Sequence, residues 1–487
     1  MTLPLLDGLP PEGLSPERLA EVARKVHRPL AEVWGVVRFY PRYGEEKDGR
    51  YLVDDPVARA RGFETLLRQA DGTHPPLGLE ALAPVFLQRK RGQTLVETPQ
   101  GPVPLSEHTL PFSLAHGQRL LPPEPLLQLE DYRAWGGLAL LKAMAEGRLS
   151  GERVLEGVEE AGLLGRGGAA FPAARKMRQV AQAPGEKYLV VNADESEPGN
   201  FKDRFLLEHN PFLVLEGALL AAKAVGAGRV WLYVRWEFQA ALRRLEAAIR
   251  ALEEAGLLLL PTEVFPSGGL YICGEETALL ESMEGRRAEP RLKPPYPVEK
   301  GLFGRPTLVN NVETLASLPV LLREGQAWRR EEPKLFSISG DVERPGLYEL
   351  PLGTPLGEAL RRAGGEPEAL LAVLLGGAAG VFVRDFSLPL KYRGPRPIGA
   401  GAVVAYNRER DLFQVMEGLA AFFAQESCGK CFPCALGTQV QLSLVQRRSR
   451  DEGLLRDLEA TLRGSLCGLG QSAYWAYKSL LEVEGAR

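Results

Sequence analysis

Four of the five cysteines in this 487-residue chain are spaced as ligands of an iron–sulfur cluster. Cys428, Cys431 and Cys434 form a C-x2-C-x2-C run, and Cys467 follows later in the chain. Three thiolates at this spacing can hold one face of a [4Fe-4S] cluster while the distant cysteine binds the fourth iron. The alternative, a structural zinc site, usually has two separated C-x2-C pairs and no compact triplet. The spacing therefore predicts a cluster that transfers electrons.

A glycine-rich loop is the second chemical signal. Gly165, Arg166, Gly167 and Gly168 begin a G-x-G-x-x-A pattern, in which backbone N–H groups can approach a phosphate at the start of the next helix. The residues before this loop look helical, whereas an ordinary dinucleotide fingerprint follows a strand. Taken alone, the loop is equally well explained as a glycine-rich connection.

Polar side chains follow the expected strands at three further places. They are Asn192, Asp194, Glu195 and Glu197 after YLVV, Glu275 and Glu276 in CGEET, and Asn310 with Asn311 in LVNN. Ligands of open α/β sheets bind at the carboxyl ends of the strands. So many acidic and amide groups would crowd like charge unless they hydrogen-bond a ligand. These clusters therefore predict a ligand site beside the glycine loop.

The surrounding sequence indicates an α/β fold class with several domains. In residues 129–330, apolar strands alternate with helices of about a dozen residues, which is typical of a mostly parallel sheet. We expect a helical bundle in residues 1–44 and a weakly patterned, proline-rich region in residues 45–128. Residues 331–410 read as a small α+β unit. Residues 411–487 read as helical and carry the cluster cysteines.

Composition narrows the possible partners and location. The chain has 59 Lys and Arg against 62 Asp and Glu, so no global field would attract nucleic acid or anionic lipid. No apolar stretch reaches the roughly 18 residues of a membrane span, and the N-terminus lacks a signal-peptide pattern. The cysteines are sparse and odd in number, which suits a reducing compartment. We therefore expect a cytoplasmic protein without nucleic-acid binding or direct membrane insertion.

Six motifs resemble those of one protein family. In chain order they are GRGGAAFP, NADESEPGNFKDR, YICGEETALLESMEG, PTLVNNVET, SCGKCFPCALG and the later Cys467. They are similar to the NADH-binding, FMN-containing flavoprotein subunit of respiratory complex I and its relatives in NAD-dependent formate dehydrogenases and NAD-reducing hydrogenases. The resemblance implies a Rossmann-like FMN/NADH domain, a small ubiquitin-like SLBB domain and a helical [4Fe-4S] domain. The first residues also resemble the helical start of a thioredoxin-like partner subunit, which implies a fused, degenerate thioredoxin-like region that carries no cluster.

The resemblance also implies roles for individual residues. The residues that would hold the FMN phosphate are Gly165, Gly167 and Gly168 with Arg166 and Lys176. Those that would contact the rest of FMN are Asn192, Asp194, Glu195, Glu275, Asn310 and Asn311. Glu197 would bind the nicotinamide carboxamide and orient it for hydride transfer, which makes it the expected catalytic residue. For the rest of NADH, the ribose would meet Glu276 and Lys293, and the adenine would lie between Phe171 and Tyr296.

A mechanism and its alternatives follow from the resemblance. Hydride would pass between NAD(H) and FMN, and single electrons would leave through the [4Fe-4S] cluster to other iron–sulfur redox subunits of a hetero-oligomeric complex. The fused N-terminus favours a soluble NAD-dependent formate dehydrogenase or hydrogenase over complex I. Ala170 and Ala174 replace usual glycines, and Gln179 replaces an expected aromatic residue. These departures motivate another alternative, a degenerate electron-relay scaffold without NADH activity.

Overall fold

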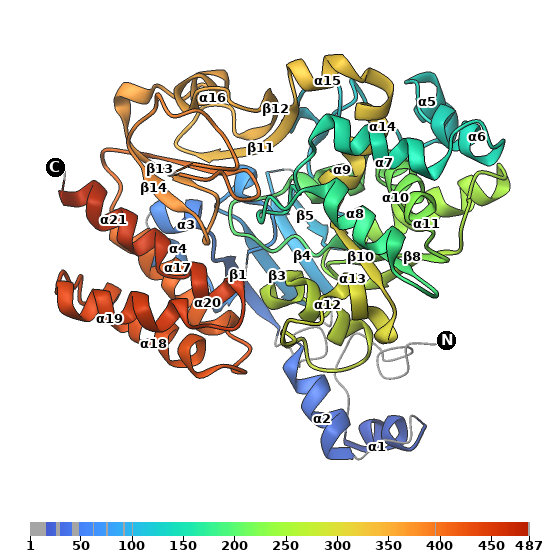
Figure 1. The fold of residues 1–487 in the computed structure, drawn as a ribbon. Coiled ribbons are helices and arrows are strands. Elements are labelled where there is room, and N and C mark those ends of the chain that lie inside the picture. The colour runs from blue at the N-terminus through green and yellow to red at the C-terminus, as the bar shows by residue number, and fades with distance from the viewer. Residues whose placement is uncertain are drawn as a thin grey trace.

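The computed structural model describes residues 16–25, 30–40, 48–61, 63–74, 76–90, 93–99, 101–394 and 396–485. Three sheets and a C-terminal helical bundle make up the molecule (Figure 1). The parallel sheet lies at the centre, the helical bundle covers one flank, and a second sheet lies above both (Figure 1).

The central sheet is all parallel and has the strand order β10-β7-β8-β9. Its strands are β7 (Tyr188–Ala193), β8 (Arg229–Val234), β9 (Thr262–Pro266) and β10 (Thr307–Asn311). The chain runs outward from β7 through β8 to β9, and then returns to the opposite side of β7 as β10. The strand order therefore reverses between β7 and β10, where open α/β sheets form their ligand crevice. This topology agrees with the expected Rossmann-like arrangement.

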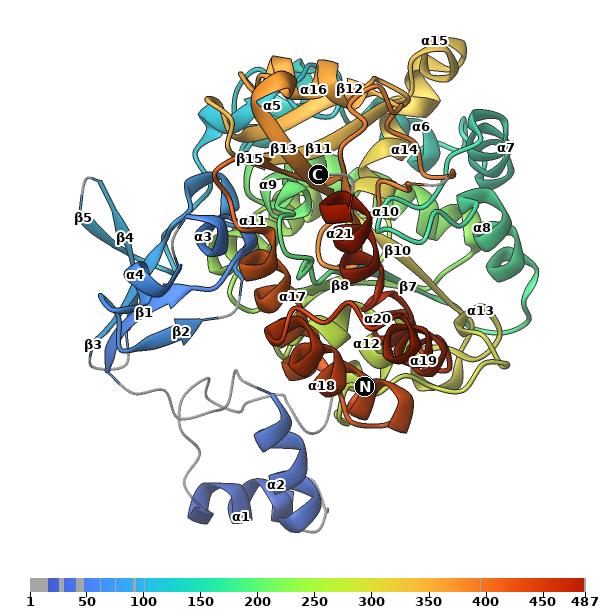
Figure 2. The same ribbon diagram turned by 90° about the vertical axis from the view of Figure 1, so that its left-hand side faces the viewer.

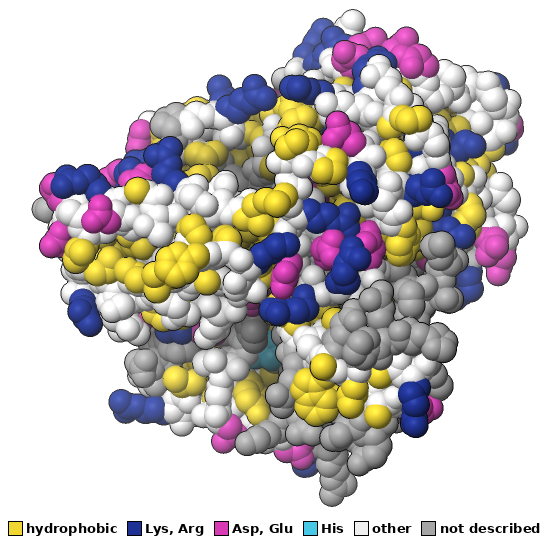
Figure 3. Space-filling view, turned by 60° about the horizontal axis from the view of Figure 1, so that its bottom comes forward, with side chains coloured by type: hydrophobic (Ala, Val, Ile, Leu, Met, Phe, Trp, Pro, Cys, Tyr) yellow, Lys and Arg dark blue, Asp and Glu magenta, His cyan; other side chains and the backbone are white. Residues whose placement is uncertain are grey.

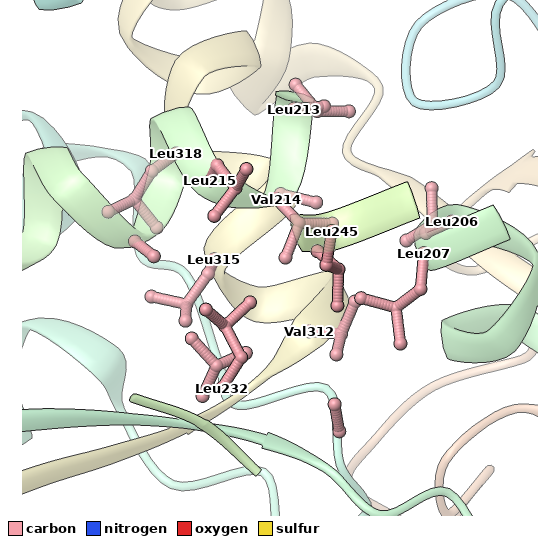
Figure 4. Packing of buried hydrophobic residues seen from close by; sticks show 14 of the residues in the cluster. Leu206, Leu207, Leu213, Val214, Leu215, Leu232, Leu245, Val312, Leu315 and Leu318 are labelled. Atoms are coloured by element: carbon pink, nitrogen blue, oxygen red, sulfur yellow. The ribbon is translucent and has the colours of Figure 1, made fainter. Parts of the chain in front are cut away.

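Both faces of this sheet are covered, as parallel sheets require. Leu189 and Val191 of β7 belong to the apolar core on one face, and Val190 belongs to the core on the other. The first face is covered by α7 (Gly151–Ala161), α8 (Ala173–Gln182), α9 (Lys202–His209), α10 (Pro211–Val225), α11 (Gln239–Glu254) and α14 (Val312–Glu324). Figure 4 shows the packing of leucine and valine side chains from these helices above the sheet. The buried side chains fix the sheet, and therefore the ends of β7 and β10.

Helices α10 and α14 cross without room for a side chain. A Cβ atom at Gly217 would lie 1.9 Å from the carbonyl oxygen of Leu315. This close approach requires glycine, because real Cβ atoms do not come so near to a backbone oxygen. It also brings the N-terminus of α14, which begins directly after Asn311, firmly against the domain core.

A second sheet follows the parallel-sheet domain in the sequence. Its order is β14-β13-β15-β11-β12-β6. The strands are β6 (Ala115–His116), β11 (Pro333–Gly340), β12 (Gly346–Pro351), β13 (Leu370–Leu375), β14 (Val381–Val383) and β15 (Ala402–Asn407), with α16 (Leu356–Arg362) packed against them. Because β6 comes from the N-terminal part of the chain, the two parts share one sheet.

The N-terminal part is more ordered than the sequence suggested. Helices α1 (Pro16–Lys25) and α2 (Leu30–Phe39) project from the body, and a separate sheet lies at its edge (Figure 2). The sheet has the order β2-β1-β3-β4-β5, with strands β1 (Gly49–Val53), β2 (Gly72–His74), β3 (Phe86–Lys90), β4 (Gln93–Thr98) and β5 (Gly101–Pro104). Strands β1 and β2 are parallel and are linked through α3 (Pro56–Ala60) and α4 (Phe63–Leu67). A β-α-β unit followed by antiparallel strands is compatible with a thioredoxin-like region, which stays a prediction.

The C-terminal part is helical, as expected. It comprises α17 (Leu412–Glu426), α18 (Phe432–Gln446), α19 (Glu452–Arg463), α20 (Gly468–Ser472) and α21 (Trp475–Gly485). Cys431 directly precedes α18 and Cys467 directly precedes α20. The helix starts therefore place two of the expected cluster ligands.

Short elements complete the fold. They are α5 (Leu129–Ala134), α6 (Ala139–Ala145), α12 (Glu276–Met283), α13 (Pro297–Lys300), α15 (Gln326–Arg330), and the 3-10 turns η2 (Glu80–Leu82), η3 (Phe112–Leu114), η4 (Tyr271–Gly274), η5 (Leu302–Gly304) and η6 (Pro367–Ala369). Within the described ranges, no single helix has the length and apolar character of a membrane span. Helices α9 and α10 pass that test only as a pair, bent by 100°.

Candidate functional site

Asparagines end both strands at the point where the strand order reverses. Asn192 of β7 and Asn311 of β10 are register partners, and Asn310 precedes Asn311. Asn311 caps α14 by accepting the N–H of Glu313 at 3.0 Å. Asn310 is only 8% exposed, and its Nδ2 has no hydrogen-bond partner in the protein. A buried amide donor without a partner costs free energy, so this group is suited to a ligand.

The glycine loop lies against these strand ends. The N–H of Gly165 donates to the carbonyl oxygen of Phe171 at 2.8 Å, which closes the loop. A Cβ atom at Gly167 would lie 3.1 Å from Cβ of Asn311, so glycine lets the loop approach β10. Gly168 has φ +110°, and Ala170 has φ +50°. An alanine in this left-handed region costs about 1 kcal/mol, so Ala170 strains the loop at a position where the family usually has glycine.

Beneath the loop lies a group of buried ions. Arg166 is fully buried and donates to Glu313 at 3.1 Å, to Glu332 at 2.9 Å and to the carbonyl oxygen of Pro333 at 2.6 Å. Lys334 and Lys202 also contact Glu313, at 2.7 and 3.3 Å. A side chain without accessible surface cannot touch a ligand unless the protein moves. The placement of Arg166 therefore argues against its expected contact with the FMN phosphate and makes it a support of the loop.

The acidic segment after β7 is held by many hydrogen bonds. Glu195 accepts the N–H groups of Asp203 and Arg204 at 3.0 and 2.9 Å, so it caps the start of α9. Asp194 accepts the hydroxyl of Ser267 at 2.6 Å. Burial raises the pKa of Asp194 to about 7, although Arg235 and Ser267 act in the opposite direction. These carboxyl groups are therefore fixed in place. Without a ligand, the nearby donors and cations offset only part of the cost of burying their charge.

Glu197 lies between two donors from different parts of the chain. Its Oε2 accepts the hydroxyl of Tyr271 at 2.7 Å, and its Oε1 accepts the N–H of Ala379 at 3.0 Å. Burial raises the pKa of Glu197 to about 7, and these two donors offset part of that shift. Each oxygen keeps a lone pair that can accept one more hydrogen bond.

Two lysines and two glutamates form a partly exposed network at the start of α12. Lys176 donates to Glu276 at 2.7 Å, and Lys293 donates to Glu275 at 2.8 Å. Glu275 also caps α12 by accepting the N–H of Thr277 at 2.9 Å. Burial opposes ionisation of Glu276, but Lys176 and Lys293 outweigh it and lower the pKa of this carboxyl. Glu276 is therefore an ionised hydrogen-bond acceptor at neutral pH.

Two aromatic side chains expected to flank adenine are exposed. Phe171 is 41% exposed and Tyr296 is 51% exposed. The guanidinium of Arg175 lies 5.7 Å from the ring centre of Phe171. Gln179 lies one helical turn beyond Arg175 on α8 and is exposed. Exposed rings of this size are suited to stacking against a planar ligand.

The four cluster cysteines line one cavity. Cys428, Cys431, Cys434 and Cys467 surround it together with Ile272, Pro290, Ser427, Lys430, Leu466 and Leu469. Across the described part of the chain, no three His, Cys, Asp or Glu side chains converge as ligands of a single metal ion would. The four thiols that share this space are the four whose spacing in the sequence is typical of [4Fe-4S] ligands.

Protein donors also point at the cluster sulfurs. The N–H of Leu466 lies 3.5 Å from Sγ of Cys431, and the hydroxyl of Ser427 lies 3.3 Å from Sγ of Cys434. Burial raises the pKa of the Cys467 thiol to about 12, so a bound metal must replace its proton. Hydrogen bonds to cluster sulfurs tune the reduction potential.

The turn η4 joins the two sites. Ile272 lines the cluster cavity, and the carbonyl oxygen of Gly274 accepts Nδ2 of Asn192 at 2.8 Å. The N–H of Tyr271 donates to Glu426 of α17 at 2.8 Å. One short turn therefore contacts the strand end, Glu197 and the helix that leads to Cys428. Sequence reasoning assigned no role to Tyr271 or Glu426, because only the fold brings them to this position.

The residues at the strand ends fit FMN, and the four cysteines fit a [4Fe-4S] cluster. The unpartnered Nδ2 of Asn310, the close approach at Gly167 and the reversal of strand order meet at one place. Lys202, Asp203, Glu313 and Lys334 were not singled out from the sequence; their only signal was their position in or near the quoted motifs. Cys273 is fully buried, which agrees with the expectation of a small apolar side chain.

Comparisons with known proteins identify three regions. The Nuo51 FMN-binding domain matches residues 158–320, the SLBB domain matches residues 335–374, and the NADH-ubiquinone oxidoreductase-F iron-sulfur binding region matches residues 414–483. An NADH-quinone oxidoreductase subunit of Aquifex aeolicus is 38% identical over 383 residues, which cover 73% of this chain and 89% of that protein. The corresponding subunit of Escherichia coli is 39% identical over 359 residues, which cover 68% and 80%.

A solved structure extends the similarity to the N-terminal part. A chain of an NAD+-reducing [NiFe]-hydrogenase in the H2-reduced state matches with a TM-score of 0.84 and 32% identity. The match covers 96% of this chain and 89% of that chain. The chain therefore belongs to the family of NADH-binding flavoprotein subunits of multi-subunit oxidoreductases, with FMN and a [4Fe-4S] cluster as its cofactors.

Proposed function

We propose that the chain is the NAD(H)-oxidising or NAD+-reducing subunit of a hydrogenase or formate dehydrogenase complex, and that its cluster exchanges electrons with a partner iron–sulfur subunit. The coverage of the chain by its relatives carries this proposal. The hydrogenase chain matches 96% of this protein, whereas the Aquifex aeolicus quinone oxidoreductase subunit matches 73%. The match to the hydrogenase chain thus extends into the N-terminal part, which supports this proposal.

The second candidate is the corresponding subunit of a complex I. It is favoured by the sequence identity of 38% to the Aquifex aeolicus quinone oxidoreductase subunit, which exceeds the 32% to the hydrogenase chain. The two candidates share the chemistry on this chain and differ only in the terminal substrate. An activity assay on the purified native complex distinguishes the two candidates. Only the first candidate would reduce NAD+ with hydrogen or formate in the absence of quinone.

In this proposal the protein supplies orientation and exclusion of water. Bound FMN would supply a group that can take a hydride from NADH and release single electrons, and a [4Fe-4S] cluster on the four cysteines would supply one-electron transfer to the partner. Asn192, Asp194 and Asn310 hold the flavin at the strand ends, with Lys176 and the loop glycines at its phosphate. Glu197 accepts a hydrogen bond from the nicotinamide carboxamide, which keeps the ring in a reactive orientation. Glu276 accepts hydrogen bonds from the ribose, and Phe171 with Tyr296 covers the adenine.

An exposed apolar stripe beside the cluster supports the partner interface. Phe432, Leu436 and Val440 recur one turn apart on α18, directly after Cys431, and Phe432 is 73% exposed. Figure 3 shows apolar side chains gathered on the left of this face, the side on which α18 and α19 lie in Figure 1. Exposed apolar patches of this kind mark sites of protein association. A partner seated there would lie next to the cluster.

A single experiment tests the catalytic part. The chain reconstituted with FMN and its cluster is mixed with NADH and an artificial one-electron acceptor. We expect reduction of the acceptor, and no oxidation of hydrogen, formate or quinol by the isolated chain. A flavin that dithionite bleaches but NADH does not would instead support the degenerate scaffold, for which Ala170 and Gln179 are the motivation.

A further inference from the structure

Two turns of the SLBB domain lie against the nucleotide site. The first turn, Gly376–Gly380, follows β13, and the second, Gly399–Gly401, precedes β15. A Cβ atom at Gly168 would lie 3.8 Å from the backbone nitrogen of Ala400, so the second turn packs on the glycine loop. These contacts bring a domain that has no assigned role in hydride transfer to the flavin and nicotinamide residues.

The SLBB domain is anchored firmly at this boundary. Lys334 of β11 donates to Glu313 at 2.7 Å and to the carbonyl oxygen of Ala400 at 2.8 Å. The hydroxyl of Ser337 donates to Asn200 at 3.0 Å and accepts the N–H of Phe201 at 3.1 Å. These groups are buried, so the two turns are held in place relative to the acidic segment after β7.

The first turn is shaped around Glu197. The N–H of Ala379 donates to Oε1 at 3.0 Å, opposite the hydroxyl of Tyr271 on Oε2. Gly377 has φ +78°, and a Cβ atom there would lie 2.5 Å from Oε1 of Glu197 and 2.8 Å from the carbonyl oxygen of Pro198. The carboxylate therefore occupies the space that any side chain at residue 377 would need.

We propose that the SLBB domain is a positioning element of the hydride-transfer site, in which the Gly376–Gly380 turn sets the orientation of the Glu197 carboxylate. The inference rests on the proposed contact between Glu197 and the nicotinamide carboxamide. With one fixed donor on each oxygen, the side chain keeps one rotamer before the nucleotide binds. A preordered acceptor loses less conformational entropy on binding, and small displacements at a reacting centre cost large factors in rate.

The test begins with Gly377→Ala in the FMN-loaded chain. The added methyl displaces Glu197, so we expect binding of NAD+, measured by calorimetry, to weaken at least tenfold, while FMN content stays at the wild-type level. The matched control is Gly353→Ala in the same domain. Gly353 has φ +100°, and its Cβ would meet only the end of the Lys391 side chain, at 3.5 Å. This control carries the same backbone strain and should bind NAD+ as the wild type does.

A rescue variant separates positioning from general damage. Glu197→Asp shortens the side chain by one methylene and withdraws the carboxylate from residue 377. We expect Gly377→Ala to weaken NAD+ binding much less in the Glu197→Asp background than in the wild type. Equal losses in both backgrounds would mean that the turn does not act through Glu197, and the inference would be wrong.

A readout without any cofactor completes the test. Hydrogen exchange of a peptide containing Ala379 should be faster in Glu197→Ala than in the wild type, because the amide loses its acceptor. Unchanged exchange would overturn the inference. Failure of the proposed function has a different signature: Glu197→Gln would leave NAD+ binding and flavin reduction by NADH at wild-type values. If Glu197→Gln impairs both and Gly377→Ala impairs neither, only the role of the SLBB turn is refuted.

Discussion

Arg166 and Glu313 form an ion pair of 3.1 Å in which neither side chain has accessible surface. Burial alone would raise the pKa of Glu313, but Lys334, Lys202 and Arg166 outweigh it and hold that pKa at about 2. Glu313 thus contacts three basic side chains beneath the glycine loop, and two of these have a further carboxylate partner: Glu332 for Arg166 and Asp203 for Lys202. The loop that contacts the strand ends is supported from below by charge pairing.

Arg166→Gln should destabilise the chain strongly. The change removes the charged donors to Glu332 and to the carbonyl oxygen of Pro333, while Glu313 keeps its contacts with Lys334 and Lys202. Loss of buried hydrogen bonds to a charged group costs about 1.5 to 3 kcal/mol. Urea unfolding can be followed by tryptophan fluorescence, to which Trp328, 5.1 Å from the Arg166 guanidinium, contributes together with the other five tryptophans. The control is Arg153→Gln, which removes an exposed pair with Glu156 and should leave the urea midpoint close to that of the wild type. Equal midpoints for the two variants would contradict the structural role of Arg166.

Sequence patterns predicted the residues that bind the cofactors better than the buried residues that hold them in position. The cysteine spacing and the polar residues at strand ends are local signals, and the structure brings both sets together. Glu313 and Lys334 are 21 residues apart and lie in different domains, so their pairing depends on packing that no local pattern encodes. Strands β3, β4 and β5 were missed because they are short and partly exposed, and because prolines occur at Pro102 and Pro104.

Cys467→Ser should remove the cluster and keep the flavin. The wild-type chain should carry about 4 irons, because the four cysteines form one complete ligand set. We expect iron content and the visible absorption of the cluster to fall to background in the variant, while FMN content is unchanged. Cys273→Ser is the control, since Cys273 does not line the cluster cavity. About 6 irons with [2Fe-2S] absorption in the wild type would refute the prediction that the N-terminal region carries no cluster.

The stability of the FMN-free chain should fall as the pH rises from about 5 to about 7. Burial raises the pKa of Asp194 and of Glu197 to about 7, well above the value near 4 of an unfolded carboxyl group. The folded chain therefore holds protons that the unfolded chain has lost, and this stabilisation disappears as pH rises through 7. The loss is at most about 1.4 kcal/mol per pH unit for each carboxyl. As the pH rises, the urea midpoint should fall less in Glu197→Gln than in the wild type. The same pH dependence in both proteins would show that Glu197 does not have a raised pKa.

Glu197→Gln should impair NADH chemistry more than FMN binding. The neutral amide is a weaker acceptor for the nicotinamide carboxamide and also changes the hydrogen bonds with Tyr271 and Ala379. We expect a raised KM for NADH or slower flavin reduction in stopped-flow absorbance, with FMN content near that of the wild type. Loss of FMN with unchanged kinetics in the remaining holoenzyme would show that the flavin and nicotinamide roles are reversed.

For Glu197, the sequence predicted the functional residue but did not predict the hydrogen-bond partners of its carboxylate. The motif and its family resemblance predicted a functional carboxylate there. The contacts with Tyr271 and Ala379 come from positions 74 and 182 residues away. The Tyr271 contact depends on how the flavin domain itself folds, and the Ala379 contact depends on how the second sheet packs on that domain.

Gln179→Phe should tighten NADH binding. Gln179 is exposed on α8, eight residues after Phe171 in the sequence, and an aromatic ring there would add a stacking surface for adenine at little cost in side-chain entropy. We expect a gain of about 1 kcal/mol, which is roughly a fivefold lower Kd in calorimetry with NAD+. Gln182→Phe on the same helix is the matched control for added apolar surface. If both variants bind equally tightly, the gain reflects general hydrophobicity, and the adenine does not lie beside Gln179.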